Sequence, residues 1–254
     1  MALTFVLEHL IGREGASTIR EMALMPKDLA PVVPDVEAGD RVVVLVHGFC
    51  ASAGVFRPLA ARLEGEADAK IATFTHAPCV GVKRIAHSLK ALVDRIPHSA
   101  RLTIVGHSLG GVVARWYVQE MGGHERVERT ISLGSPFGGV AVPRYFVGSD
   151  IHGESALLQR LRERAADSGV PHTSVVATED RVVPGVQTAC LGTGDVVILR
   201  GRGHNTLLFD EEVAGLVIDR VRWPAERLEA ASSGEVPSDG SSGELPSVAD
   251  VAAE

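Results

Sequence analysis

The chain has 254 residues, of which 45% are hydrophobic, so it can bury one substantial core, and a single α/β domain is the simplest organisation. The formal charge is −7, but residues 231–254 hold five acidic residues and no basic one, which accounts for −5 and leaves −2 for the rest. This balance lacks the basic footprint of a nucleic-acid-binding protein, so we expect no nucleic-acid partner.

The cysteines and the N-terminus bear on location. Cys50, Cys79 and Cys190 are odd in number and scattered, which argues against a disulfide framework and favours a reducing compartment. They show no C-x-x-C spacing, and we expect neither a metal site nor a cofactor. The N-terminus has no basic n-region and no run of about 18 apolar residues, so we expect no Sec export and no transmembrane segment. A cytoplasmic protein is therefore expected.

Residues 1–40 are interpreted as an N-terminal helical segment and a linker. Apolar residues recur at helical spacing over 4–25, and Gly12 and Gly15 separate two short amphipathic helices. Their apolar face lacks the dense Lys/Arg partner face of membrane-surface helices, so packing against the body is favoured over a membrane or lid role. Three prolines over 25–40 predict an extended linker.

Short apolar runs alternate with helical patterns from residue 41 onward. The continuous β-branched run at 41–46 is typical of a strand buried on both faces of a parallel sheet. Alternation at this spacing predicts an α/β domain over 41–224, with a mostly parallel sheet covered by helices on both faces. The expected strands are 41–46, 70–75, 102–105, 127–133, 172–177 and 196–199, and the expected helices are 54–63, 82–96, 111–118, 154–166 and 205–222.

Two segments stand outside this alternation. Residues 140–169 interrupt it, and because insertions in such sheets enter at the carboxyl ends of strands, we expect a cap or lid there, with Tyr145 and Phe146 lining the substrate pocket. For Leu157, Leu158 and Leu161, at helical spacing, a place in the core is the open alternative. Residues 225–254 are acidic and rich in Ser, Gly and Pro, and we expect this tail to be disordered.

A serine stands between a strand and a helix in Gly106-His107-Ser108-Leu109-Gly110. A serine in that setting occupies a tight, strained turn, and the two glycines let the strand and the helix approach each other. The hydroxyl of Ser108 is then raised above the sheet edge, at a helix N-terminus that favours developing negative charge. Ser108 is the candidate nucleophile.

A serine nucleophile needs a base, and the base needs a carboxylate. Among ten histidines, His204 alone follows a late strand across a short loop and precedes a helix. Asp180 follows the strand ending at Ala177 and is the chosen carboxylate, with the adjacent Glu179 as the alternative. The chain order serine, acid, histidine is that of the α/β-hydrolase arrangement.

An acyl-transfer transition state also needs backbone N–H groups for its oxyanion. One is expected from Leu109, directly after the nucleophile, and the other from Phe49, in the turn after the first strand of the domain. His47 and His107 flank these turns and are interpreted as structural hydrogen-bonding residues. Cys50 is interpreted as a small buried thiol.

Taken together, the sequence resembles an α/β-hydrolase of the lipase and esterase type. VLVHGF, GHSLGG, LGSPFGG, TEDRVVP and GRGHNTLLF stand in family order over 41–210, and bacterial lipases with GHSLGG are the nearest subgroup. Phe137 follows Pro136 where that subgroup commonly has histidine. The resemblance implies a serine carboxylester hydrolase acting on a small-molecule ester or lipid. Acyltransferase or thioesterase activity with the same triad, or a catalytically silent binding module, are the alternatives.

Overall fold

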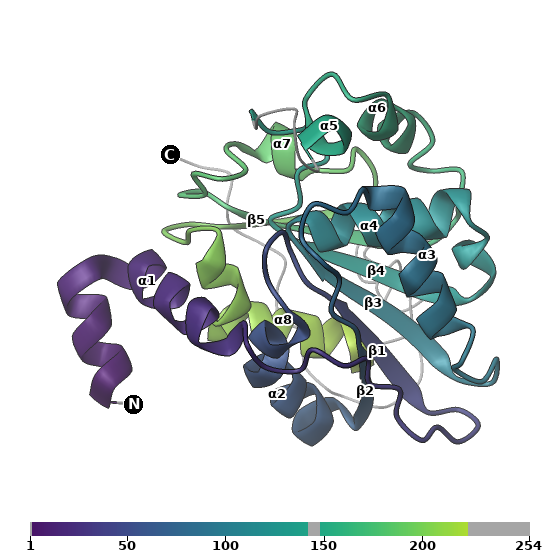
Figure 1. Ribbon diagram of the computed structural model, residues 1–254, viewed down its shortest axis with the longest axis horizontal. Coiled ribbons are helices and arrows are strands. Elements are labelled where there is room, and N and C mark those ends of the chain that lie inside the picture. The colour runs from purple at the N-terminus through teal and green to yellow at the C-terminus, as the bar shows by residue number, and fades with distance from the viewer. Residues whose placement is uncertain (1, 142–147, 223–254) are drawn as a thin grey trace, which may run out of the picture. The chain divides into compact units, whose positions relative to one another are not determined.

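A computed structural model describes residues 2–141 and 148–222. Six strands form one sheet in the order β2-β1-β3-β4-β5-β6, and every neighbouring pair is parallel (Figure 1). The predicted parallel sheet is therefore confirmed. The strands are β1 (Arg41–Val46), β2 (Ala69–Thr73), β3 (Arg101–His107), β4 (Val127–Leu133), β5 (His172–Ala177) and β6 (Asp195–Leu199).

Helices cover both faces of this sheet, as Figure 1 shows. One face packs against α3 (Val82–Val93), α4 (Leu109–Glu120) and α6 (Ala156–Glu163), and the opposite face packs against α2 (Arg57–Ala67) and α8 (Glu211–Arg222). The remaining helices are α1 (Ala2–Leu24), α5 (Gly148–Ile151) and α7 (Val186–Ala189), with 3₁₀ turns η1 (Ala53–Phe56), η2 (Gly123–Glu125) and η3 (Asn205–Leu208).

Strand β1 shows why the sequence favours this arrangement. Val42, Val44 and Val46 point into the core under α3 and α4, whereas Val43 and Leu45 point into the core under α2 and α8. All five are fully buried, so both faces of the strand contribute to stability through the removal of apolar surface from water.

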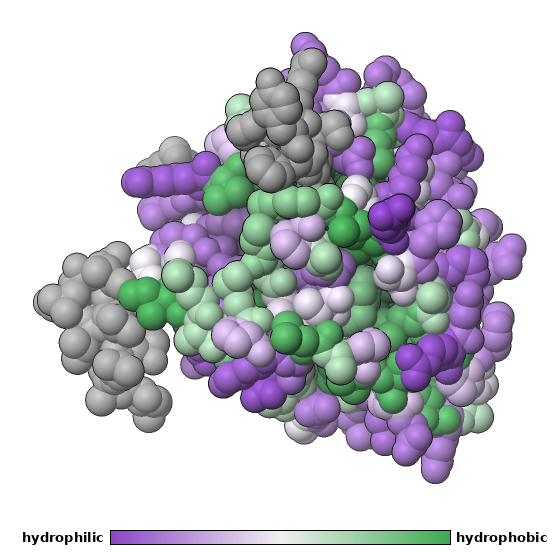
Figure 2. Space-filling model, viewed as in Figure 1, coloured by the Kyte–Doolittle hydropathy of each residue, from purple (hydrophilic) through white to green (hydrophobic). Residues whose placement is uncertain are grey.

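The N-terminal helix α1 is kinked at Gly12, where φ is 74° and ψ is 167°. This is one of the two glycines at which the sequence predicts a break; Gly15 lies inside the helix. Beyond the kink, α1 lies against η1 and η3, and Ala16 and Ser17 are buried there. Figure 2 shows apolar surface over the part of α1 beyond the kink and over the following linker. The exposed apolar residues of this stretch are Ile19, Met22, Leu29 and Val32. No helix among the described residues is long and apolar enough to cross a membrane.

The interruption at 140–169 is described only in part. Leu157, Leu158 and Leu161 of α6 are buried in the core shared with α4, which is the alternative that the sequence leaves open for them. Tyr145 and Phe146, proposed as pocket residues, lie outside the described residues, as does the tail at 225–254. The cap at this edge of the sheet therefore stays a prediction.

The strand order positions the candidate site. From β1 the chain moves outward to β2 and then returns to the other side of β1 with β3, so the order reverses between β1 and β3. Val46 pairs with Gly106, which sets the turn after β1 beside the turn after β3. Ligand sites of open α/β sheets lie at the carboxyl ends of the strands at such a reversal.

Candidate active site

Ser108 occupies the turn between β3 and α4. Its backbone has φ 52° and ψ −121°, a left-handed conformation that costs a non-glycine residue about 1–3 kcal/mol. Its N–H donates to the carbonyl of Leu133 at 2.8 Å, which fixes the turn to β4. A Cβ on Gly110 would overlap the carbonyl of Val46, and one on Gly106 would overlap the backbone of Gly111. The two glycines are thus needed for the helix to approach the sheet.

His204 and Asp180 lie together at the same edge of the sheet. The Nδ1–H of His204 donates to Oδ2 of Asp180 at 2.7 Å, and both side chains are buried. Oδ1 of Asp180 accepts from the N–H groups of Val182 and Val183 at 2.8 and 2.7 Å. Glu179 is exposed, so the structure brings Asp180, and not the alternative Glu179, to the histidine.

The imidazole of His107 connects the turn of Ser108 to His204. The rings of His107 and His204 are 4.7 Å apart between centroids, and Nε2–H of His107 donates to the carbonyl of His204 at 3.3 Å. Burial lowers the pKa of His107 well below its usual value, so this ring stays neutral. His107 thus has the structural contacts expected of it, and it holds the histidine loop beside the serine turn.

Gly134, which the sequence analysis did not select, lies beneath the His204–Asp180 pair. Its φ is 57°, and a Cβ there would lie 3.1 Å from Oδ2 of Asp180 and 3.2 Å from Nδ1 of His204. Any side chain at this position would therefore press on the hydrogen bond between the two groups. The motif LGSPFGG, which contains Gly134, was the available sequence signal. The contact itself depends on how the ends of β4, β5 and β6 meet, which the motif does not contain.

The turn after β1 is held by His47. Nδ1–H of His47 donates to the carbonyl of Gly48 at 2.8 Å, while Nε2 accepts from the N–H of His76 at 3.0 Å. The two imidazole rings stack at 3.8 Å between centroids. Burial, with a smaller contribution from His76, lowers the pKa of His47 to about 3, so the ring is neutral and both nitrogens are used.

This contact orients the next peptide group. The carbonyl of Gly48 faces His47, and because C=O and N–H point in opposite directions across a trans peptide, the N–H of Phe49 faces away from His47. A Cβ on Gly48 would lie 3.0 Å from Cβ of Ser108, so the turn adjoins the serine. The N–H of Leu109 lies in the first turn of α4, where helix N–H groups lack an intrahelical acceptor. Cys50, expected to be buried, is exposed in this turn, where its φ is 55°.

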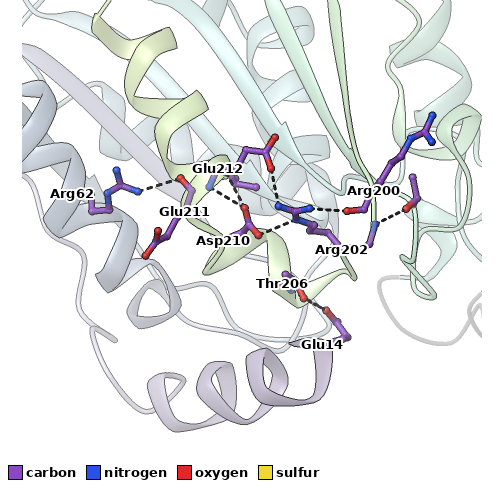
Figure 3. A network of polar contacts seen from close by, with 11 residues as sticks. Glu14, Arg62, Arg200, Arg202, Thr206, Asp210, Glu211 and Glu212 are labelled. Carbon is purple, nitrogen blue, oxygen red and sulfur yellow. Dashed lines mark hydrogen bonds and ion pairs between the residues drawn. The ribbon is translucent and has the colours of Figure 1, made fainter. Parts of the chain in front are cut away.

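The loop that carries His204 is fastened by Arg202. Its guanidinium donates to Asp210 at 3.0 Å and to Glu212 at 2.7 Å (Figure 3). Its carbonyl accepts from the N–H of Glu179 at 2.9 Å. A second attachment comes from Glu14 of α1, which no sequence signal indicated because Glu14 is 191 residues away from its partner Asn205. Among the described residues, no group of three His, Cys, Asp or Glu side chains could hold a metal ion.

The parallel sheet, the helices on both faces and the serine turn define an α/β-hydrolase fold. Lipase B from Aspergillus fumigatus is similar, with a TM-score of 0.62 and 16% identity over 77% of this chain and 56% of the lipase. A monoacylglycerol lipase from Paleococcus ferrophilus has a TM-score of 0.60 and 15% identity over 77% of this chain and 98% of its own. The lipase BlEst2 from Bacillus licheniformis, in mature form, has a TM-score of 0.60 and 12% identity over 75% and 95%.

The family follows from the sequence comparison. A family model of palmitoyl protein thioesterases matches residues 42–179, which is more than half of the chain, and the protein belongs to that family. No curated protein sequence matched it. The match includes the turns of Phe49 and Ser108 and ends one residue before Asp180, so the roles of Asp180 and His204 depend on the geometry described above.

Proposed function

We propose that the protein is a serine acyl hydrolase that cleaves carboxylic esters through an acyl-enzyme on Ser108. The observation that carries the proposal is the buried 2.7 Å hydrogen bond between His204 and Asp180, beside the strained turn of Ser108. Because Asp180 accepts a hydrogen bond from Nδ1–H, the neutral imidazole keeps its lone pair on Nε2, the nitrogen that a general base must offer.

The reaction then proceeds in two halves. His204 takes the proton of Ser108 as Oγ attacks the carbonyl carbon, and the imidazolium returns that proton to the leaving oxygen. Asp180 stabilises the imidazolium and holds its orientation. Water, activated by His204, then attacks the acyl-enzyme, and the acid leaves as Ser108 regains its proton. The N–H groups of Phe49 and Leu109 are the proposed oxyanion donors, and removal of one such donor typically costs about 10²–10³ in rate.

Thioester hydrolysis is the second candidate, and the family match favours it. The same groups would act, since a thiolate is a good leaving group and the acyl-enzyme is identical. An acyltransferase would differ only in its acceptor, which the pocket selects. Tyr145 and Phe146 stay proposed pocket residues, and the substrate is proposed to be a small ester or lipid in the cytoplasm.

A paired substrate panel tests the proposal. p-Nitrophenyl esters and acyl-coenzyme A thioesters, each from acetyl to palmitoyl, are offered to the wild type and to Ser108→Ala. We expect ester hydrolysis by the wild type and its loss in Ser108→Ala. Thioester turnover exceeding ester turnover would make the second candidate correct. Turnover of neither series, together with no reaction with a fluorophosphonate, would favour a catalytically silent binding module.

A further inference from the structure

Glu14, in the half of α1 beyond the Gly12 kink, contacts the residues that directly follow His204. Its Oε1 accepts from the N–H of Asn205 at 2.8 Å, and its Oε2 accepts from the N–H and the Oγ1–H of Thr206 at 2.9 and 2.8 Å. Figure 3 shows the carboxylate pointing at Thr206. One carboxylate thus accepts three hydrogen bonds at the start of η3, where backbone N–H groups lack local acceptors.

The neighbouring contacts indicate that the loop is shaped around Glu14. A Cβ on Gly203 would overlap the Glu14 carboxylate, so glycine leaves the room that this carboxylate fills. Nδ2 of Asn205 also donates to Oγ1 of Thr18, one turn further along α1, at 3.1 Å. Burial raises the pKa of Glu21, which lies two turns beyond Glu14 on α1.

These attachments complement those on the other side of the loop. Arg202, two residues before His204, binds Asp210 and Glu212. Glu14 binds Asn205 and Thr206, the two residues after His204. Attaching the loop to the body on both sides of His204 restricts its backbone, and so the direction of its side chain. With Glu14 removed, the peptide group after His204 would keep the 3.3 Å contact of its carbonyl with His107 but lose the acceptor of its N–H.

We propose that Glu14 is a positioning residue for His204, and that α1 is therefore part of the active site of this chain. The inference rests on the proposed function of His204 as the base. It goes beyond the family match, which begins at residue 42 and excludes α1. A displacement of the base by about 1 Å can reduce turnover about 10²-fold, so a contact of this kind bears directly on kcat.

The test compares Glu14→Gln with a matched control in the full-length protein. Gln has one acceptor oxygen and one NH₂ group, so it cannot satisfy donors on both sides of the carboxylate. The control is Glu66→Gln, which removes an exposed carboxylate that pairs with Arg62 on α2. We expect kcat for a p-nitrophenyl ester to fall about 10- to 100-fold in Glu14→Gln, with KM within about twofold. The rate of fluorophosphonate labelling should fall in parallel, and Glu66→Gln should leave both unchanged.

Active-site titration separates positioning from folding, because turnover is divided by the number of sites that can be labelled. A kcat per labelled site equal to wild type would overturn the proposal, whatever the melting temperature. If Glu14→Gln does not fold, Thr206→Val removes one of the three hydrogen bonds at similar volume and should lower kcat by a smaller factor without changing KM. An unchanged kcat in that variant would also overturn the proposal.

The variant Ser108→Ala distinguishes a failure of the Glu14 proposal from a failure of the proposed function. Loss of activity in Ser108→Ala, with wild-type turnover per site in Glu14→Gln, contradicts the role of Glu14 alone. Activity retained in Ser108→Ala contradicts the proposed function, and the role of Glu14 with it.

Discussion

Two adjacent carboxylates, Asp180 and Glu179, differ sharply in their surroundings. Asp180 is buried and accepts hydrogen bonds from His204, Val182 and Val183, whereas Glu179 is exposed and contacts the histidine loop only through its backbone N–H. Residues next to each other in a turn point in different directions, which sequence order alone does not resolve.

Substitution of each carboxylate should therefore have unequal effects. Asp180→Asn should lower kcat by about two to four decades, because the N–H groups of Val182 and Val183 hold the amide oxygen, and the NH₂ group then faces Nδ1 and leaves the imidazole in the wrong tautomer. Glu179→Gln should lower kcat by less than one decade. Steady-state kinetics on one ester compares the two variants, and the reverse ranking would transfer the role to Glu179.

Residues of the proposed triad could be selected from the sequence because each lies in the short segment that follows a predicted strand. Parallel strands bring their carboxyl ends to one edge, so Ser108, Asp180 and His204 converge without any knowledge of side-chain packing. Gly134 and Glu14 could not be found in this way. The first matters through the space it leaves beneath two other residues, and the second through hydrogen bonds across most of the chain.

The approach of β1 to α4 is the contact between elements that the serine turn requires. A Cβ on Gly110 would meet backbone atoms of Val46 and His47, which cannot move aside as a flexible side chain can. Gly215 offers a matched control in α8, since a Cβ there would have no atom within 4 Å. Both glycines lie within a helix, but only Gly110 lies so close to other backbone atoms that a Cβ would overlap them.

Alanine at these two positions should act in opposite directions. Gly110→Ala should reduce the free energy of unfolding by about 1–3 kcal/mol or more, because it forces the helix away from the sheet. Gly215→Ala should raise it by up to about 1 kcal/mol, because alanine is the better helix former. Urea unfolding measures both, and an unperturbed Gly110→Ala would show that the helix is free to shift.

Most elements were predictable from periodicity, and β4 and β5 begin and end where the sequence indicates. The ends of helices were less predictable than the strands. The expected helix over 205–222 is divided into η3 and α8, because Asp210 accepts from the N–H groups of Glu212 and Val213 and begins a new helix there. For α6, helical spacing is compatible with both a lid and a core helix, and only its partner α4 decides that its leucines are core.

Buried histidines set the response of the whole molecule to acid. Burial holds the pKa of His47 at about 3 and the pKa values of His107 and His172 well below the usual 6.5. The folded state therefore keeps these rings neutral below pH 6.5, whereas the unfolded chain protonates them. Unfolding takes up protons there, so stability is present above pH 6.5 and is lost as the pH falls below it toward the folded-state pKa values.

Each such histidine contributes a slope of about 1.4 kcal/mol per pH unit once the pH is well below 6.5. The three together predict a loss of about 4 kcal/mol per pH unit, comparable with the whole stability of many domains. His172→Gln is the variant to examine, because His172 begins β5, at the opposite end of the strands from Ser108, and contacts Thr130 and Ser132. Urea unfolding between pH 6.5 and 5 should show a shallower slope in this variant, and an identical slope would contradict the assignment.

The most direct measurement is the site of covalent labelling. The wild type is treated with a fluorophosphonate, digested and analysed by peptide mass spectrometry, with Ser108→Ala and His204→Ala treated in parallel. We predict one phosphonate adduct per molecule on Ser108, none in Ser108→Ala, and labelling slowed by orders of magnitude in His204→Ala, because the hydroxyl has lost its base. An adduct on another residue, or rapid labelling of folded Ser108→Ala, would contradict the assignment of Ser108 as the nucleophile.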